Sequence, residues 1–245
     1  MGEDCYIEKL SDYIDYIENL DSKFCLSRGQ GKLYDLLPGA LRKKEGKQLY
    51  TKNEIEEYLN ELKLNAYNFL ETQIDIKDEL EWMLYAQHYG LPTRLLDFTK
   101  SHIISLMFAV EKAFESGEDG DGVVYFLNPT ELNLKNLEKK KICQEHSELS
   151  KSSGPIVVQS RKINKRVQAQ NGLFVYFNYN DLPLNEEKNE EIIKRVIIKK
   201  DSKKSILSSL FNLGIGFSNL YPELNYLVKD ILMRKTIEQY VKEAE

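Results

Sequence analysis

Eleven residues in the first half of the chain read Gln87-His88-Tyr89-Gly90-Leu91-Pro92-Thr93-Arg94-Leu95-Leu96-Asp97. They place an amide, an imidazole, a guanidinium and a carboxylate beside a segment, residues 77–89, whose pattern otherwise predicts a buried helix. Polar groups near a core cost free energy unless each finds a partner. The stretch therefore indicates either a ligand site or a buried structural network.

The spacing of this predicted helix turns its last two polar side chains inward. At about 100° per residue, Gln87 and His88 fall on the same side as Leu84. Gly90 ends the helix, and Pro92 prevents its continuation. We expect Gln87 and His88 to point toward whatever Leu84 packs against.

Hydrophobic periodicity predicts helices before and after a cluster of strands. Apolar residues spaced three and four apart predict helices over residues 1–22, 53–70, 77–89, 101–114, 202–213 and from 222 onward. Apolar, β-rich runs predict strands over residues 23–26, 123–127, 155–159, 173–177 and 192–198. Because strands and helices do not alternate regularly, we predict an α+β fold with a small mixed or antiparallel sheet flanked by helices.

The organisation along the chain favours one domain over residues 1–245. Residues 131–153 are polar and rich in Lys and Glu, so we expect a solvated helix followed by a loop, as an insertion of low order. The last helix is expected to carry its aliphatic residues inward, namely Leu224, Leu227, Val228, Ile231 and Leu232.

Composition excludes several classes of protein. The net charge of −5 argues against broad nucleic-acid binding, which requires a basic excess. No apolar run approaches the roughly 20 residues that span a membrane, and the acidic N-terminus lacks the order of a secretory signal. Cys5, Cys25 and Cys143 form neither a disulfide framework nor a zinc pattern. We expect a cytoplasmic protein without a membrane partner.

Arg28 is the second candidate for binding chemistry. It follows the strand predicted over 23–26 and precedes Gly29-Gln30-Gly31, and the whole segment Ser27-Arg28-Gly29-Gln30-Gly31 is expected to break that strand. A guanidinium beside exposed backbone N–H groups suits a phosphate. A turn whose arginine pairs with a carboxylate explains the same pattern, and the residues alone leave both interpretations open.

Arg94 and Asp97 lie three residues apart. They fall on opposite faces if the segment is extended and form an ion pair if it is a turn, and we favour the ion pair. Asp97 is also able to orient His88 or Arg28. His88, His102 and Asp97 match no spacing typical of metal ligands, so no metal is expected.

The segment before the strand at 173–177 carries Gln168 and Gln170, which we expect on one face of an extended approach. Their amides suit either a neighbouring loop or a sugar or nucleobase. Ser27, Ser101 and Ser105 lack the sequence of a nucleophile elbow, so covalent hydrolysis is disfavoured.

Together these pieces resemble the FRG domain. Arg28-Gly29-Gln30 is similar to the (F/Y)RG motif that names it, although Ser27 replaces the usual aromatic residue. The resemblance continues over residues 36–42, 86–99, 108–109, 122–125, 170–174, 214–215 and 220–224.

A second resemblance is to arginine-class ADP-ribosyltransferases, which carry an aromatic-Arg-Gly strand, a Ser-Thr-Ser strand and a Gln/Glu-x-Glu element. Arg28-Gly29, Asp97-Phe98-Thr99-Lys100-Ser101 and Gln168-Ala169-Gln170 are similar to these three elements in turn. The resemblance implies a fold of that kind and NAD as the cofactor. Ligand contacts are then expected from Gly29, Gln30, Gln87, His88, Thr93, Arg94 and Ser101.

In this resemblance Arg28 would hold a diphosphate, and Thr99 or Ser101 would fix the nicotinamide ribose. Gln170 stands where the catalytic glutamate of these enzymes lies. A neutral amide does not offset developing positive charge as a carboxylate does. Either another carboxylate such as Asp97 serves, or the domain binds a ligand without catalysing transfer.

The sequence thus yields two hypotheses. The first is a bacterial FRG-domain protein that binds a nucleotide-like ligand such as NAD, with ADP-ribosyltransferase-like transfer to a protein acceptor in phage defence or as a toxin. The second is a non-catalytic module that binds a protein or nucleic acid and whose polar cluster is structural. The biological role in the first is an analogy.

Overall fold

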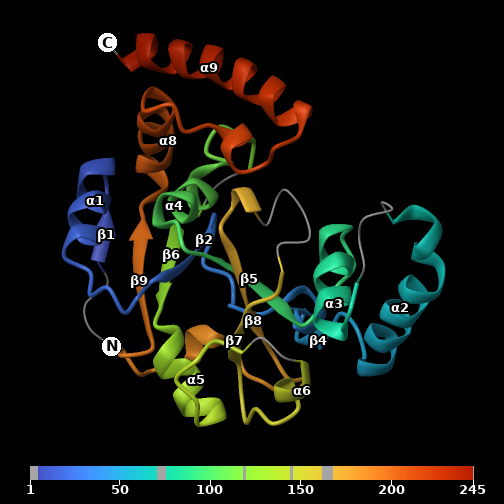
Figure 1. Ribbon diagram of the computed structural model, residues 1–245. Helices are drawn as coiled ribbons and strands as arrows, with labels where there is room; N and C mark the ends of the chain where they lie inside the picture. Colours follow the sequence, from blue (N-terminus) through green and yellow to red (C-terminus); the bar gives the residue numbers. More distant parts are fainter. Residues whose placement is uncertain (1–4, 71–75, 118–119, 144–145, 162–167, 245) are drawn as a thin grey trace.

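The computed structural model describes residues 5–70, 76–117, 120–143, 146–161 and 168–244. Within them, seven strands form one central sheet in the order β1-β9-β6-β2-β5-β8-β7 (Figure 1). The strands are β1 Cys5–Ile7, β2 Leu26–Gln30, β5 Leu95–Thr99, β6 Gly122–Leu127, β7 Ile156–Val158, β8 Gly172–Tyr176 and β9 Ile193–Ile198. A separate hairpin joins β3 Lys43–Lys44 to β4 Lys47–Gln48. The pair β1–β9 is parallel and the other pairs in the sheet are antiparallel, which confirms the predicted mixed sheet of an α+β fold.

Helices pack on both faces of this sheet. The α-helices of the described residues are α1 Leu10–Glu18, α2 Lys52–Asn65, α3 Glu79–His88, α4 His102–Val110, α5 Pro129–Leu137, α6 His146–Leu149, α8 Lys203–Asn212 and α9 Leu224–Ala244. All six residues of β6 are buried, because Val124 and Phe126 pack in the cluster that includes α4 and α8 while Tyr125 and Leu127 pack on the opposite face. Among the described residues, no helix combines the length and the apolar character needed to cross a bilayer.

The N-terminal segment differs from the helix predicted over residues 1–22. Tyr6 and Ile7 belong to β1, where Tyr6 pairs with Ile197 of β9. Pairing at the sheet edge therefore overrides the helical spacing of these apolar residues. The helix α1 begins only at Leu10, where the Asp12 carboxylate accepts the backbone N–H of Lys9 at 2.9 Å.

The strand predicted over residues 23–26 is shifted along the chain: β2 begins only at Leu26 and runs through Gln30, paired along its length with β6. Gly29 is therefore part of β2 and does not end the strand. Its missing side chain allows close packing: a Cβ on Gly29 would lie 1.7 Å from the Ser105 carbonyl oxygen of α4. The glycine permits the helix to approach the strand.

Residues 131–153 contain a packed helix, so the expectation of a solvated segment is wrong for α5. Leu132 is buried in the core and Asn133 is fully buried. The Asn133 amide donates to the carbonyl oxygens of Lys141 and Val157, and its oxygen accepts the Val157 N–H at 2.7 Å. These bonds fasten α5 to β7.

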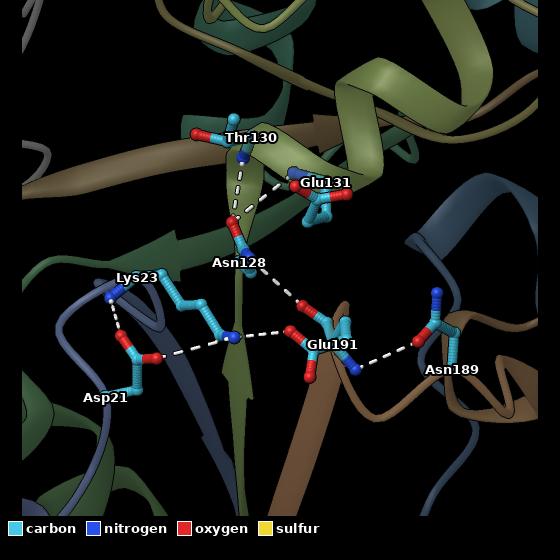
Figure 2. A network of polar contacts seen from close by, with 7 residues as sticks. All are labelled: Asp21, Lys23, Asn128, Thr130, Glu131, Asn189 and Glu191. Carbon is cyan, nitrogen blue, oxygen red and sulfur yellow. Dashed lines mark hydrogen bonds and ion pairs between the residues drawn. The ribbon is translucent and has the colours of Figure 1, made fainter.

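A polar network fixes the start of α5 against two strands (Figure 2). The Asn128 side chain accepts the N–H of Glu131 at the start of the helix and donates to the Glu191 carbonyl oxygen at 3.0 Å. The Glu191 carboxylate pairs with Lys23, which precedes β2. The network therefore holds the end of β6, the approach to β9 and the approach to β2 together.

Helix α8 is tied to the glycine-rich end of β2. Lys203, at the start of α8, is only 1% exposed, and its Nζ donates to the Gly31 carbonyl oxygen at 2.6 Å. A buried ammonium needs such a partner. The contact joins the late part of the chain to the strand that carries Arg28.

Helix α9 faces the opposite way from the prediction. The five aliphatic residues expected inward are all exposed, whereas Asp230 is 2% exposed. The Asp230 carboxylate accepts the backbone N–H groups of Phe217 at 2.6 Å and Ser218 at 3.1 Å. These bonds cap the short 3-10 helix η5 (Phe217–Asn219) and set the rotation of α9, because the carboxylate loses its partners if the helix turns.

Candidate functional site

The central sheet opens between β2 and β5. The two strands pair at Ser27 and Thr99, and the register does not continue beyond that position. Each strand runs on along its other neighbour, β2 along β6 and β5 along β8. A cavity of about 460 Å³ lies at this opening.

Most of the predicted site residues meet at this cavity. It is lined by Arg28, Gly29, Gln30, Gln87, His88, Asp97, Thr99 and Gln170, which come from β2, α3, β5 and the segment before β8. Thr93, Arg94 and Ser101 are not among its lining residues. The structure thus brings together residues that lie as much as 142 positions apart, as Arg28 and Gln170 do.

Arg28 spans the opening between the strands. Its Nη1 donates to the Asp97 carbonyl oxygen at 2.9 Å and lies 3.8 Å from the Asp97 carboxylate. The guanidinium thereby satisfies a carbonyl at the edge where β5 has left β2. Its Nε is buried and has no hydrogen-bond partner among the described residues. Burial lowers the pKa of Arg28, and the Asp97 charge opposes that shift.

Asp97 is held from both sides. The Gln87 amide donates to its carboxylate at 2.7 Å, and the Thr93 hydroxyl donates to the Gln87 oxygen at 2.7 Å. Thr93 therefore positions Gln87, although it does not line the cavity. The Asp97 side chain lines the cavity and is 54% exposed. Its position inside the cavity partly removes the carboxylate from bulk water and raises its pKa, while the charge of Arg28 lowers that pKa.

Arg94 does not pair with Asp97, so the predicted ion pair is wrong. The Arg94 guanidinium donates to the Tyr176 hydroxyl and lies 4.3 Å from the ring centroid of Tyr179. The reason is that Asp97 lies in the extended strand β5 and not in a turn, and its carboxylate faces Arg28. Arg94 fastens β5 to the segment after β8.

Thr99 and Ser101 serve the backbone. The Thr99 hydroxyl donates to the Gln170 carbonyl oxygen at 2.5 Å and accepts the Ser101 N–H at 2.9 Å. Thr99 is 4% exposed, so its proton is committed inside the protein. Ser101 is the residue before α4, and its hydroxyl forms no cap. Thr99 therefore presents no free hydroxyl donor to a ribose, and Ser101 is not among the residues that line the cavity.

The two glutamines do not share the face of a strand. Gln168 is helical and Gln170 lies in a turn, closed by the bond from the Asn171 N–H to the Gln168 carbonyl oxygen at 3.2 Å. Asn171 has a φ of 48°, so extended backbone begins only at Gly172. Residues 162–167 of the same segment lie outside the described residues. The Gln170 amide donates to the Leu220 carbonyl oxygen at 3.2 Å.

Sequence reasoning missed a second carboxylate at the cavity. Glu111, just after α4, lines it together with Lys112 and Tyr221. The Tyr221 hydroxyl donates to Glu111 at 3.2 Å, and burial raises the pKa of Glu111. Its one sequence signal is a lone carboxylate directly after an apolar helix. Tyr221 lies within the FRG resemblance at residues 220–224, but no local pattern predicts its contact with Glu111, because the two residues lie 110 positions apart.

A second polar cluster lies behind β2, against α4. Ser27 Oγ is 2.8 Å from both Ser105 Oγ and His102 Nδ1. Ser27 and Ser105 are fully buried, and burial lowers the pKa of His102. Wherever side chains are described, no three His, Cys, Asp or Glu residues gather as metal ligands.

Comparison with known proteins finds a likeness to a family over part of the chain. A family model described as FRG domain matches residues 24–118, which include β2, α3, β5 and α4. The FRG-domain resemblance is thereby confirmed for this segment. No curated protein and no solved structure matches the chain.

Proposed function

Taking residues 24–118 as an FRG domain, we propose that the cavity between β2 and β5 binds a nucleotide-like ligand, with NAD as the first candidate. One observation carries the proposal. Arg28 borders an open cavity while its Nε is buried without a hydrogen-bond partner among the described residues. A buried donor left unpaired costs about 1–3 kcal/mol. Because the Arg28 side chain borders the cavity and is 18% exposed, a small rotation of the guanidinium would bring its N–H groups to an acceptor on a ligand.

The surroundings of Arg28 suit a phosphorylated ligand. Its guanidinium offers N–H groups to phosphate oxygens, and the backbone at Gly29 and Gly31 borders the same cavity. Lys112 adds positive charge. Tyr34 at the rim is 60% exposed, which leaves its ring accessible to a base.

The finer proposal is ADP-ribosyl transfer to a protein acceptor. In that reaction the bond from the ribose C1′ to nicotinamide breaks, nicotinamide leaves, and a nucleophile of the acceptor bonds to C1′ and gives up its proton. Positive charge develops on the ribose. Gln170 is neutral, but Asp97 and Glu111 both border the cavity and carry the charge that Gln170 lacks.

Ligand binding is tested by calorimetry and thermal unfolding of the full chain with NAD, ADP-ribose and AMP. A ligand at about 100 times its Kd stabilises the folded state by about 2.7 kcal/mol. We expect Arg28→Ala to weaken binding at least about tenfold, since charge-assisted bonds are lost. Arg234→Ala, an exposed arginine on α9 away from the cavity, is the matched control. Absence of binding by all three nucleotides contradicts the proposal.

Transfer is tested separately with labelled NAD and a bacterial lysate, by measuring nicotinamide release and label on protein. We expect Asp97→Asn or Glu111→Gln to abolish release while NAD still binds. Binding without any release leaves a nucleotide-binding domain without this activity. Action in phage defence or as a toxin rests on analogy and follows only if a labelled acceptor is found.

The alternative is a non-catalytic interaction module, and one observation favours it. Thr93, Gln87 and Asp97 form a chain of internal hydrogen bonds, as a structural network does. In that case Arg28→Ala would destabilise the free protein and no nucleotide would stabilise it. The same thermal unfolding experiment therefore separates the two functions.

A further inference from the structure

Helix α9 lies at one end of the molecule (Figure 1) and is held along one side only. On that side the Asp230 carboxylate caps η5, Ile237 is 5% exposed, and the Tyr240 ring packs edge-on against Phe114 at 5.5 Å. These contacts fix the rotation of the helix. The opposite side consequently has a defined and constant face.

The outward face of α9 is aliphatic over its first half. We call the α9 stripe the five residues Leu224, Leu227, Val228, Ile231 and Leu232, which are 76%, 47%, 49%, 57% and 65% exposed. Their spacing places them side by side on one face of the helix. Single exposed apolar residues are ordinary, but a contiguous patch marks an interaction site.

The stripe has the symmetry of a self-association surface. A two-fold axis between Lys229 and Asp230 exchanges position 227 with 232 and position 228 with 231. It therefore places Leu227 opposite Leu232 of a second copy, and Val228 opposite its Ile231. A two-fold contact requires such a self-complementary surface. We infer that two copies of this chain associate through antiparallel α9 helices.

The area agrees with this occupant. The same axis places Arg234 opposite Asn225 and Lys235 opposite Leu224, which avoids like-charge repulsion at these positions but adds no charge complementarity. From the exposed fractions, the stripe offers roughly 500 Å² per copy. Two copies bury roughly 1,000 Å², the lower limit of a specific interface. We therefore expect a weak dimer.

The interface adjoins the cavity without being part of it. Tyr226 of α9 stacks on Tyr221, a cavity residue, with ring centroids 4.1 Å apart. The association nevertheless depends on the stripe alone. Its test is therefore independent of whether the cavity binds a nucleotide.

Sedimentation velocity of the full chain, from about 1 μM to about 500 μM, tests the inference, since an interface of this size dissociates in that range. We expect a concentration-dependent dimer. Ile231→Glu, at the centre of the stripe, should raise the dimer Kd at least about tenfold. Val241→Glu is the matched control, because Val241 is 40% exposed on the same helix outside the stripe. A monomer at every concentration, or a dimer indifferent to Ile231→Glu, overturns the inference.

A mixing experiment tests the antiparallel register. Leu227→Lys and Leu232→Glu should each weaken self-association, because each places a charge against leucine in both halves of the contact. In an equimolar mixture, the lysine of one variant meets the glutamate of the other, and association should recover to within about tenfold of wild type. No recovery, with both variants folded by circular dichroism, contradicts this register.

Discussion

Ser27 and Arg28 are neighbours on β2, but their polar groups meet opposite surroundings. The Ser27 hydroxyl is fully buried between Ser105 and His102, and it has a partner on each side. The Arg28 guanidinium reaches into the opening between β2 and β5, and its Nε has no partner among the described residues. A closed network of this kind serves the stability of the fold, whereas an incomplete one beside a cavity serves a ligand.

The comparison depends on the close approach of α4 to β2, and Gly29→Ala should abolish it. The added Cβ would lie 1.7 Å from the Ser105 carbonyl oxygen, so the strand and helix must separate. We expect a loss of about 3 kcal/mol or more in the free energy of unfolding, measured in urea. Gly39→Ala is the control, because its Cβ would meet nothing closer than 3.8 Å. Equal stability of both variants would contradict the packing described for β2.

Ser27→Ala should produce the second largest loss of stability. It removes the hydroxyl that joins Ser105 to His102 and leaves buried polar groups without a partner. The free energy of unfolding should fall by about 1–3 kcal/mol. Ser11→Ala, at an exposed position, should change it by less than about 0.5 kcal/mol. Ser27 borders the cavity, but its hydroxyl is buried against Ser105 and His102, so nucleotide affinity should stay close to that of wild type; a parallel loss of affinity would place the hydroxyl in the site.

Arg28→Met should have the opposite effects, namely a small change in stability and a large loss of nucleotide affinity. Methionine fills similar space but removes the bond to the Asp97 carbonyl oxygen, and water in the cavity can solvate the 54% exposed Asp97 side chain, so the ligand-free protein should lose about 0.5–1.5 kcal/mol of stability. Nucleotide binding should be lost in the calorimetric assay. If Arg28→Met instead destabilises the free protein as much as Ser27→Ala does, both residues are structural and the comparison fails.

The smallest effect concerns pH. Burial raises the pKa of Glu111 above 4.5, so the folded state holds this proton more tightly than the unfolded chain. Its contribution to stability is therefore lost as pH rises from 4.5 through the raised pKa. Glu111→Gln removes this loss while an oxygen remains for Tyr221. The free energy of unfolding of the variant should therefore rise relative to that of wild type between about pH 4 and about pH 7.

Urea unfolding at both pH values gives that difference directly. The groups that act on Glu111, namely Lys112, Glu115, Tyr221 and Lys229, are the same in both proteins. Both proteins also contain His102, so the effect of its lowered pKa on stability cancels in the difference between them. A stability difference that does not vary with pH would show that the Glu111 carboxyl is solvated as in the unfolded chain.

The sequence was most informative where local patterns decide structure. The buried run at 123–127 became β6, and the helix ending before Gly90 became α3, with Gln87 and His88 at the cavity as its spacing predicted. Gly90 has a φ of 89°, which explains why a glycine stops that helix. These features depend on contacts within a few residues.

Features set by distant contacts were not predictable in the same way. Helical spacing at Tyr6 gave no sign of the β9 edge with which it pairs. The stripe of α9 has the spacing of an inward face, but the single carboxylate of Asp230 turns it outward. Glu111 gained its place at the cavity from Tyr221, far along the chain. In each case the deciding partner lies in another part of the sequence.

The Lys203 contact has a consequence for where this protein can be divided. The FRG match ends at residue 118, but the Gly31 carbonyl oxygen, three residues after Arg28, takes its proton donor from residue 203. β6, which completes the other side of β2, also begins after that boundary. The segment that matches the family model therefore depends on contacts from outside it, and truncation at residue 118 would leave Arg28 on a strand without its β6 partner.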